Sequence, residues 1–156
     1  MYKVEFKNNS AYIKGLEHFD LANTLDCGQA FRWSVNDNNI WSGIVSGIYL
    51  ELEKTDDGTI ILYNTNEEIF NSIWKDYFDL ERDYDTIISS VQNNDILKTA
   101  AEFGKGIRVL NQEPWETLCS FIISQNNNIK RIKGIIKTLC ENFGEKIDGG
   151  YAFPSA

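Results

Sequence analysis

The chain has 156 residues, of which 42% are hydrophobic, 13% aromatic and 24% charged, and its formal net charge is −8. The aromatic content excludes an intrinsically disordered chain, and no apolar run reaches the roughly 18 residues that a membrane-spanning helix needs. Three widely spaced cysteines form no zinc motif and suit a reducing compartment, so we expect a cytoplasmic globular protein without metal or cofactor.

Alternating apolar and polar side chains in the first third of the chain predict β-strands. Runs of this kind occupy residues 2–6, 31–35 and 48–53, and a further strand is expected at 59–63. Turn-forming residues separate the runs at 36–39, 46–47 and 56–58. The pattern predicts a twisted antiparallel sheet of about five strands.

Beyond residue 65 the apolar residues recur at helical spacing. Thr65-Asn66-Glu67-Glu68 matches a capping box and predicts a helix that continues to Tyr77. Further helices are expected at 84–92, at 96–103, from Glu113-Pro114 onward, and from 129 to 143. The helix after Pro114 is apolar nearly all round, so we expect it to be buried. Strands followed by helices indicate an α+β fold.

The charge is distributed unevenly along the chain. Residues 1–96 contain 7 basic and 17 acidic side chains, whereas residues 97–156 contain 8 basic and 6 acidic ones. Such asymmetry is a weak indication of a surface that faces nucleic acid.

One polar segment, Ser124 to Lys133, connects the last two predicted helices and continues into the second. It holds three consecutive asparagines followed by cations, which are Asn126, Asn127, Asn128, Lys130, Arg131 and Lys133. The plainer interpretation is a helix–turn–helix junction with an N-cap and a solvated face. The alternative is contact with DNA, because amides and guanidinium groups read base edges and lysines bind phosphates.

The usual catalytic constellations are absent from the sequence, which has no phosphate loop and a single histidine, His18. We expect His18 to be a partly buried residue held by hydrogen bonds rather than a catalytic one. The segment Asp26–Trp33 contains Gly28, and a glycine lets the backbone approach a ligand closely. The alternative is a turn that leads into a strand, with Phe31 and Trp33 entering the core.

Two motifs, Cys27-Gly28-Gln29-Ala30-Phe31-Arg32-Trp33 and Ser124-Gln125-Asn126-Asn127-Asn128-Ile129-Lys130-Arg131-Ile132, resemble those of 8-oxoguanine DNA glycosylases. The stretch from Gly106 to Gly144 is similar as well. The resemblance implies a TBP-like antiparallel sheet with helices, followed by a helical domain with a helix-hairpin-helix element. Members of this family flip the damaged base out of DNA, cleave its glycosidic bond and then cut the strand at the abasic site.

The resemblance also implies roles for individual residues. The Gly28 carbonyl would accept a hydrogen bond from the N7–H of 8-oxoguanine, whereas normal guanine presents a lone pair there. Asn126 would enter the space that the flipped base leaves, and Arg131 would bind the orphaned cytosine. Asn127 and Asn128 would hold the loop and cap the next helix. Lys130 and Lys133 are expected to contact DNA on the chemistry of their charge alone, apart from the resemblance.

In this family the catalytic lysine and aspartate lie downstream of the residues present here, so no catalytic residue is expected in this chain. We therefore expect residues 1–105 to form the N-terminal α+β domain and residues 106–156 to begin the helical domain of a longer enzyme. Its partner would be duplex DNA with 8-oxoguanine opposite cytosine, and it would act as a monomer in a bacterial cytoplasm. Two alternatives are a non-catalytic damaged-DNA-binding or TBP-like module, and an acidic interaction domain without a DNA role.

Overall fold

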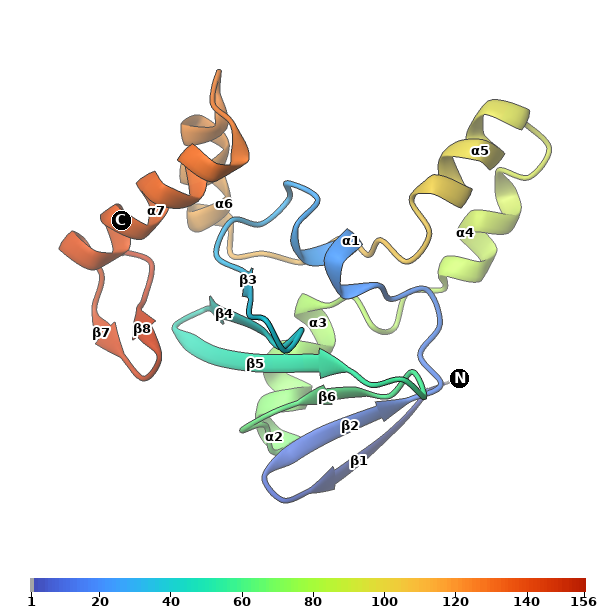
Figure 1. Ribbon diagram of the computed structural model, residues 1–156, viewed down its shortest axis with the longest axis horizontal. Helices are drawn as coiled ribbons and strands as arrows, with labels where there is room; N and C mark the ends of the chain where they lie inside the picture. The colour runs from blue at the N-terminus through green and yellow to red at the C-terminus, as the bar shows by residue number, and fades with distance from the viewer. Residues whose placement is uncertain (1) are drawn as a thin grey trace.

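The computed structural model describes residues 2–156. Its centre is a six-stranded antiparallel sheet, with the strand order β1-β2-β6-β5-β4-β3 (Figure 1). The strands are β1 (Lys3–Lys7), β2 (Ser10–Lys14), β3 (Ser34–Val35), β4 (Trp41–Val45), β5 (Ile48–Lys54) and β6 (Ile60–Leu62). The predicted α+β fold is confirmed, although the sheet has six strands rather than about five. The strand expected at 31–35 is only Ser34–Val35, because only these two residues pair with β4.

A nearly continuous helical segment packs against the sheet and closes the main core. It comprises α2 (Glu67–Ile69), the π-helical turn η1 (Phe70–Trp74) and α3 (Lys75–Tyr77). The predicted capping box is wrong in its first residue, because Asn66 rather than Thr65 caps the helix and accepts a hydrogen bond from the Ile69 amide at 2.8 Å. The Thr65 hydroxyl is directed back to the Tyr63 carbonyl instead.

Trp33 anchors this core from the opposite side. It is buried, and its indole N–H donates to the Tyr77 hydroxyl at 2.8 Å. Gly43 on β4 makes this packing possible, because a Cβ atom there would lie 2.5 Å from the Trp33 ring. Trp33 therefore belongs to the core, as the sequence predicted, and β4 must carry a glycine beneath it.

The remaining helices form two pairs that extend from the sheet region (Figure 1). One pair consists of α4 (Tyr84–Ser90) and α5 (Asp95–Phe103), and the other of α6 (Pro114–Ser124) and α7 (Ile129–Phe143). The short helix α1 (Leu21–Leu25) lies between the two pairs. A short hairpin of β7 (Lys146–Ile147) and β8 (Gly150–Tyr151) follows. None of the helices in residues 2–156 combines the length and apolar character needed to cross a membrane.

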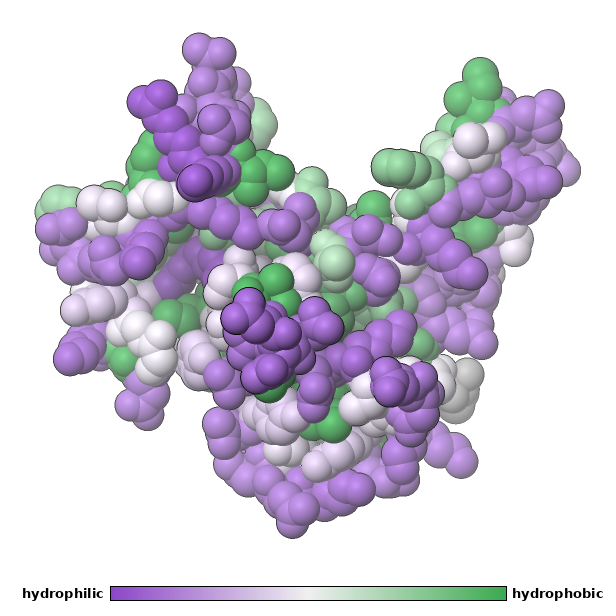
Figure 2. Space-filling model, in the orientation of Figure 1, coloured by the Kyte–Doolittle hydropathy of each residue, from purple (hydrophilic) through white to green (hydrophobic). Residues whose placement is uncertain are grey.

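The expectation that the helix after Pro114 is buried is wrong. Only one face of α6 is covered, and Phe121 and Ile122 remain 64% and 61% exposed. Figure 2 shows apolar side chains on both helical pairs, beside the hollow that separates them. Some of the apolar side chains of α6 therefore form an exposed face and are not part of the core within residues 2–156.

A second, smaller core lies under α7. Ile132, Ile136 and Cys140 are buried there, and Phe31 from the segment before β3 packs against them. The α7 helix is thus attached to the sheet domain through a residue of the Gly28 segment. This contact is the basis of the site described next.

Candidate nucleic-acid interface

The turn between α6 and α7 presents Asn126 at its tip. Asn126 is exposed, has a φ of 55°, and makes no side-chain hydrogen bond within residues 2–156. Its two neighbours hold the turn: the Asn127 amide donates to the Ile123 carbonyl at 2.7 Å, and the Asn128 side chain accepts from the Arg131 amide at 3.0 Å. The predicted N-cap is confirmed at Asn128, and Asn126 is left free to contact a ligand.

Gly28 lies in a loop that faces this helical pair. Its φ is 94°, a conformation that side-chain-bearing residues rarely adopt, and a Cβ atom there would approach Ile129 at 3.8 Å. The glycine is therefore required by backbone conformation rather than by lack of space. Gly28 belongs to the first sequence motif and Ile129 to the second, about a hundred residues later. Their proximity shows that the fold brings the two motifs together.

A cavity of about 370 Å³ lies where the two motifs meet. Its lining includes Gly28, Gln29, Phe31, Thr117, Ser120, Phe121, Ser124, Asn127, Ile129 and Ile132. Aromatic, aliphatic and hydroxyl groups of this kind suit a flat heterocycle with polar edges. No acidic, basic or histidine side chain lines the cavity, so within residues 2–156 it offers a binding surface without a group for acid–base or nucleophilic chemistry.

The loop around Gly28 is held by a network that sequence reasoning missed. The Gln29 amide donates to the carbonyls of Thr24 and Arg108 at 2.9 and 2.8 Å, and its oxygen accepts from the Leu110 amide at 3.0 Å. The Gln29 carbonyl in turn accepts from Gln112 at 2.7 Å. Except for Thr24, which is five residues away, these partners lie 79 to 83 residues away in sequence, so no local pattern could have indicated them.

The cations of the second motif differ in how they are engaged. Lys130 and Arg131 are exposed and form no ion pair within residues 2–156, so both can meet a phosphate or a base. Lys137 pairs loosely with Glu141 at 3.8 Å. Lys133 is different, because its ammonium lies 2.6 Å from Asp26 and 3.0 Å from the Trp33 carbonyl. The predicted DNA contact of Lys133 would require this ammonium to leave two partners or to use its third proton.

Arg32 and Glu116 form a second link between the loop and the helical pair. Their charged groups lie 3.4 Å apart, and Arg32 also donates to the Tyr151 carbonyl. Burial raises the pKa of Glu116 above its ordinary value, although the guanidinium of Arg32 partly offsets this. Neither residue was singled out from the sequence.

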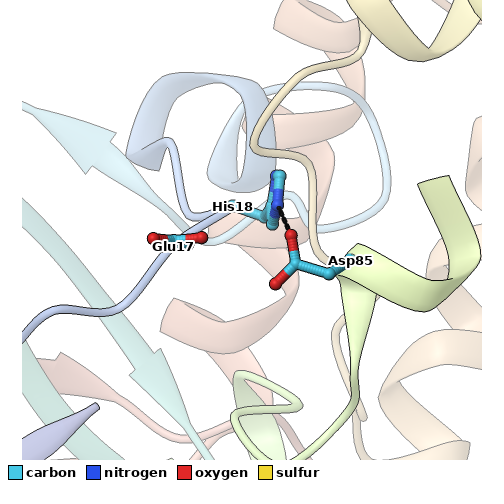
Figure 3. A group of neighbouring side chains, drawn as sticks. All are labelled: Glu17, His18 and Asp85. Atoms are coloured by element: carbon cyan, nitrogen blue, oxygen red, sulfur yellow. Dashed lines mark hydrogen bonds and ion pairs between the residues drawn. The ribbon is translucent and has the colours of Figure 1, made fainter. Parts of the chain in front are cut away.

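His18 is not among the residues that line this cavity, and Figure 3 shows it beside Asp85. Its Nε2 pairs with Asp85 at 2.7 Å, so the predicted hydrogen-bonded histidine is confirmed, while its buried Nδ1 has no partner. Ligand atoms of Glu17, His18 and Asp85 lie within 4.8 Å of one another. The guanidinium of the buried Arg108 donates to the Glu17 carbonyl at 3.0 Å and places positive charge beside this group, which disfavours a cation there.

Comparisons with known proteins agree with this geometry. Residues 11–118 match the family model for the N-terminal domain of 8-oxoguanine DNA glycosylase. An N-glycosylase/DNA lyase of Saccharomyces cerevisiae is 34% identical over 157 residues, which cover 87% of this chain and 41% of the yeast protein. The chain thus spans less than half the length of this curated relative.

Solved structures are similar over nearly the whole chain. The structure of MBOgg1 in complex with a low-affinity DNA ligand superposes with a TM-score of 0.93 and 42% identity, covering 99% of this chain and 55% of that one. The 8-oxoguanine glycosylase/lyase of Clostridium acetobutylicum gives a TM-score of 0.90 and 39% identity in its apo form. In complex with double-stranded DNA containing cytosine opposite 8-oxoguanine, that protein gives a TM-score of 0.92 and 40% identity.

The fold and the paired motifs thus match the N-terminal part of DNA glycosylases, with a loop from the sheet region facing a helical pair. More specifically, the chain belongs to the family of 8-oxoguanine DNA glycosylases. The resemblance inferred from the two motifs is confirmed.

Proposed function

We propose that the protein to which this chain belongs excises 8-oxoguanine from double-stranded DNA and then cleaves the strand, and that residues 2–156 supply much of its lesion recognition. The observation that carries this proposal is the cavity of about 370 Å³ where Gly28, held at a φ of 94°, faces α6 and α7. Glycosylase and lyase activities are named for the yeast and Clostridium relatives, and 8-oxoguanine is named for the Clostridium protein.

Gly28 would distinguish the lesion from normal guanine. Its carbonyl would accept a hydrogen bond from the N7–H that 8-oxoguanine has and guanine lacks. With guanine the carbonyl would face a lone pair, and two acceptors opposed in a dry cavity are costly. The network around Gln29 holds the adjacent peptide, so the loop is organised before the base arrives.

The turn between α6 and α7 would act on the rest of the duplex. Asn126 would occupy the space that the flipped base leaves, and Arg131 would donate two hydrogen bonds to the orphaned cytosine. Lys130 would contact phosphate. We expect the protein to act as a monomer on duplexes with 8-oxoguanine opposite cytosine in the bacterial cytoplasm, and residues 106–156 to begin its helical domain.

The chemistry would come from elsewhere in the protein. The cavity has no lysine or aspartate among its lining residues, in keeping with the family pattern in which both catalytic residues lie downstream. The open apolar face of α6 offers a surface against which further helices of such a domain would pack. A module that binds damaged DNA without cutting it would share the cavity but lack the two activities.

The test is the preference of the whole protein, as its gene encodes it, for an 8-oxoguanine·cytosine duplex over a guanine·cytosine duplex of the same sequence. Gly28→Ala keeps the carbonyl, but an alanine is strained at a φ of 94°, so the carbonyl should shift and the preference should fall at least tenfold, the size of one lost hydrogen bond to a buried group. The matched control is Gly58→Ala, because Gly58 also has a positive φ, of 82°, but lies in open space. A preference that survives Gly28→Ala would show that the lesion is read elsewhere.

A further inference from the structure

Lys133 lies between the two halves of the proposed recognition site. It projects from α7, two residues after Arg131, and reaches the loop that contains Gly28. Its ammonium contacts Asp26 on one side of Gly28, at 2.6 Å, and the Trp33 carbonyl on the other side, at 3.0 Å. One side chain therefore connects the segment around the glycine with the helix that carries Arg131.

The burial of Lys133 shows that this is more than a chance surface pair. Its side chain is 29% exposed, whereas that of Lys137, one turn further along α7, is 75% exposed. A lysine ammonium has three protons to donate, and two of them are used on this loop. The Trp33 end is rigid because the Trp33 side chain is buried in the main core.

The packing beside Lys133 also holds α7 against the loop that contains Gly28. Its neighbour Ile132 is buried in the small core that includes Phe31, a residue of the same loop. An apolar contact and a charge-assisted pair thus hold the loop and α7 at one spacing. Charge-assisted hydrogen bonds are stronger than neutral ones. The one between Lys133 and Asp26 joins residues that are 107 positions apart in the sequence.

We propose that Lys133 is a positioning residue for lesion recognition: by holding Asp26 and the Trp33 carbonyl, it fixes the Gly28 carbonyl relative to α7. This inference rests on the proposed function of Gly28. It assigns Lys133 a role in selectivity through the loop, rather than in general affinity through a phosphate. As a consequence, reading of the lesion and reading of the opposite base are mechanically coupled through α7.

The two roles of Lys133 predict different results. If Lys133 holds the loop, Lys133→Met should lower the binding preference for 8-oxoguanine·cytosine over guanine·cytosine duplexes about tenfold, as expected for one lost charge-assisted hydrogen bond. The dependence of affinity on salt should stay unchanged, because no phosphate contact is lost. If Lys133 instead binds phosphate, both duplexes should weaken equally and the salt slope should fall by about one, which would overturn the proposal.

The experiment measures dissociation constants of the whole protein for both duplexes at four salt concentrations. Asp26→Asn should lower the preference as well, and the double variant with Lys133→Met should lose no more than Lys133→Met alone, because the two residues act through one contact. Lys133→Arg, which keeps donors at this position, should retain most of the preference. Lys137→Met is the matched control on the same helix and should leave it unchanged.

Two failures remain distinguishable. If the unaltered protein shows no preference for the 8-oxoguanine duplex, the proposed function fails. If it shows that preference and Lys133→Met keeps it in full while remaining folded by circular dichroism, only the positioning role of Lys133 fails.

Discussion

The guanidinium of Arg32 and the carboxylate of Glu116 lie 3.4 Å apart at the junction of α6 and the loop that contains Gly28, with side chains only 10% and 18% exposed. Arg32 also donates to the Tyr151 carbonyl, so three segments of the chain meet at this guanidinium. The pair lies close to the loop, and the buried Trp33 follows Arg32 directly. Desolvation outweighs the attraction of Arg32, since the pKa of Glu116 is raised.

A raised pKa for a carboxyl group gives a pH dependence of known sign. The folded protein holds the Glu116 proton more tightly than the unfolded chain does. As pH rises above the ordinary value of 4.5, the unfolded chain ionises first, so stability is lost until the pKa of the folded state is passed. We expect the free energy of unfolding, measured in urea between pH 4 and 7, to fall relative to that of Glu116→Gln. A constant difference between the two proteins would show that Glu116 is ionised equally in both states.

Asn126 should matter for DNA and little for folding. Its side chain is exposed and bonds to nothing else within residues 2–156, so Asn126→Ala removes no packing. In the whole protein this change should weaken lesion binding by about 1–3 kcal/mol, as is typical of a direct base contact. Asn126→Gly controls for the positive φ, because it removes the amide while relieving the backbone. Unchanged binding together with a collapse of thermal stability would identify the asparagine as purely structural.

Arg131 should set the preference for cytosine opposite the lesion. A guanidinium can donate to both O2 and N3 of an unpaired cytosine, whereas the exocyclic amine of adenine presents a donor and meets the arginine poorly. Arg131→Ala should therefore compress the ratio of cleavage rates for cytosine over adenine, measured on four duplexes at one salt concentration. Lys130→Ala, the neighbouring exposed cation, should weaken all four about equally. An unaltered ratio would reduce Arg131 to one part of a basic surface.

A protein made of these 156 residues alone should show no glycosylase activity and form no borohydride-trapped adduct with 8-oxoguanine DNA. The physical reason is that the cavity beside Gly28 is lined by no lysine, aspartate or histidine within the described part of the chain. A Schiff base needs an amine at the reacting carbon. A trapped complex would show that a lysine outside the lining of the cavity can reach the bound base and act as the nucleophile.

Gly43 should be the glycine that the main core tolerates least. A Cβ atom there would meet the Trp33 ring at 2.5 Å, and both residues are fixed in the interior. Gly43→Ala should lower the free energy of unfolding by about 1–3 kcal/mol, as overpacking does. Gly134→Ala is a control of opposite sign, because Gly134 lies inside α7 with open space around it, and alanine there should stabilise the helix by about 0.5–1 kcal/mol. Urea titrations of both variants decide the matter.

The sequence predicted the helices and caps that depend on local periodicity. It did not predict burial or hydrogen bonds that depend on contacts between distant residues. The helix of residues 129–143 was placed correctly, because its apolar stripe and its cap at Asn128 are local features. The exposure of α6 could not be predicted, since an apolar helix has the same composition whether or not a partner covers it. The contacts of Gln29 with Arg108 and Leu110, and of Lys133 with Asp26, were missed for a related reason: these partners lie 79 to 107 residues away in the sequence.

The approach of Gly28 to Ile129 has a consequence for the order in which the protein is made. The first motif leaves the ribosome about a hundred residues before the second, and the sheet domain can fold in the interval. The cavity forms only when α7 docks, because Ile129 and Ile132 of α7 provide one of its walls. A nascent or partly unfolded molecule therefore has the glycine loop but no cavity, and on the proposed function it would acquire selectivity for damage only when α7 docks.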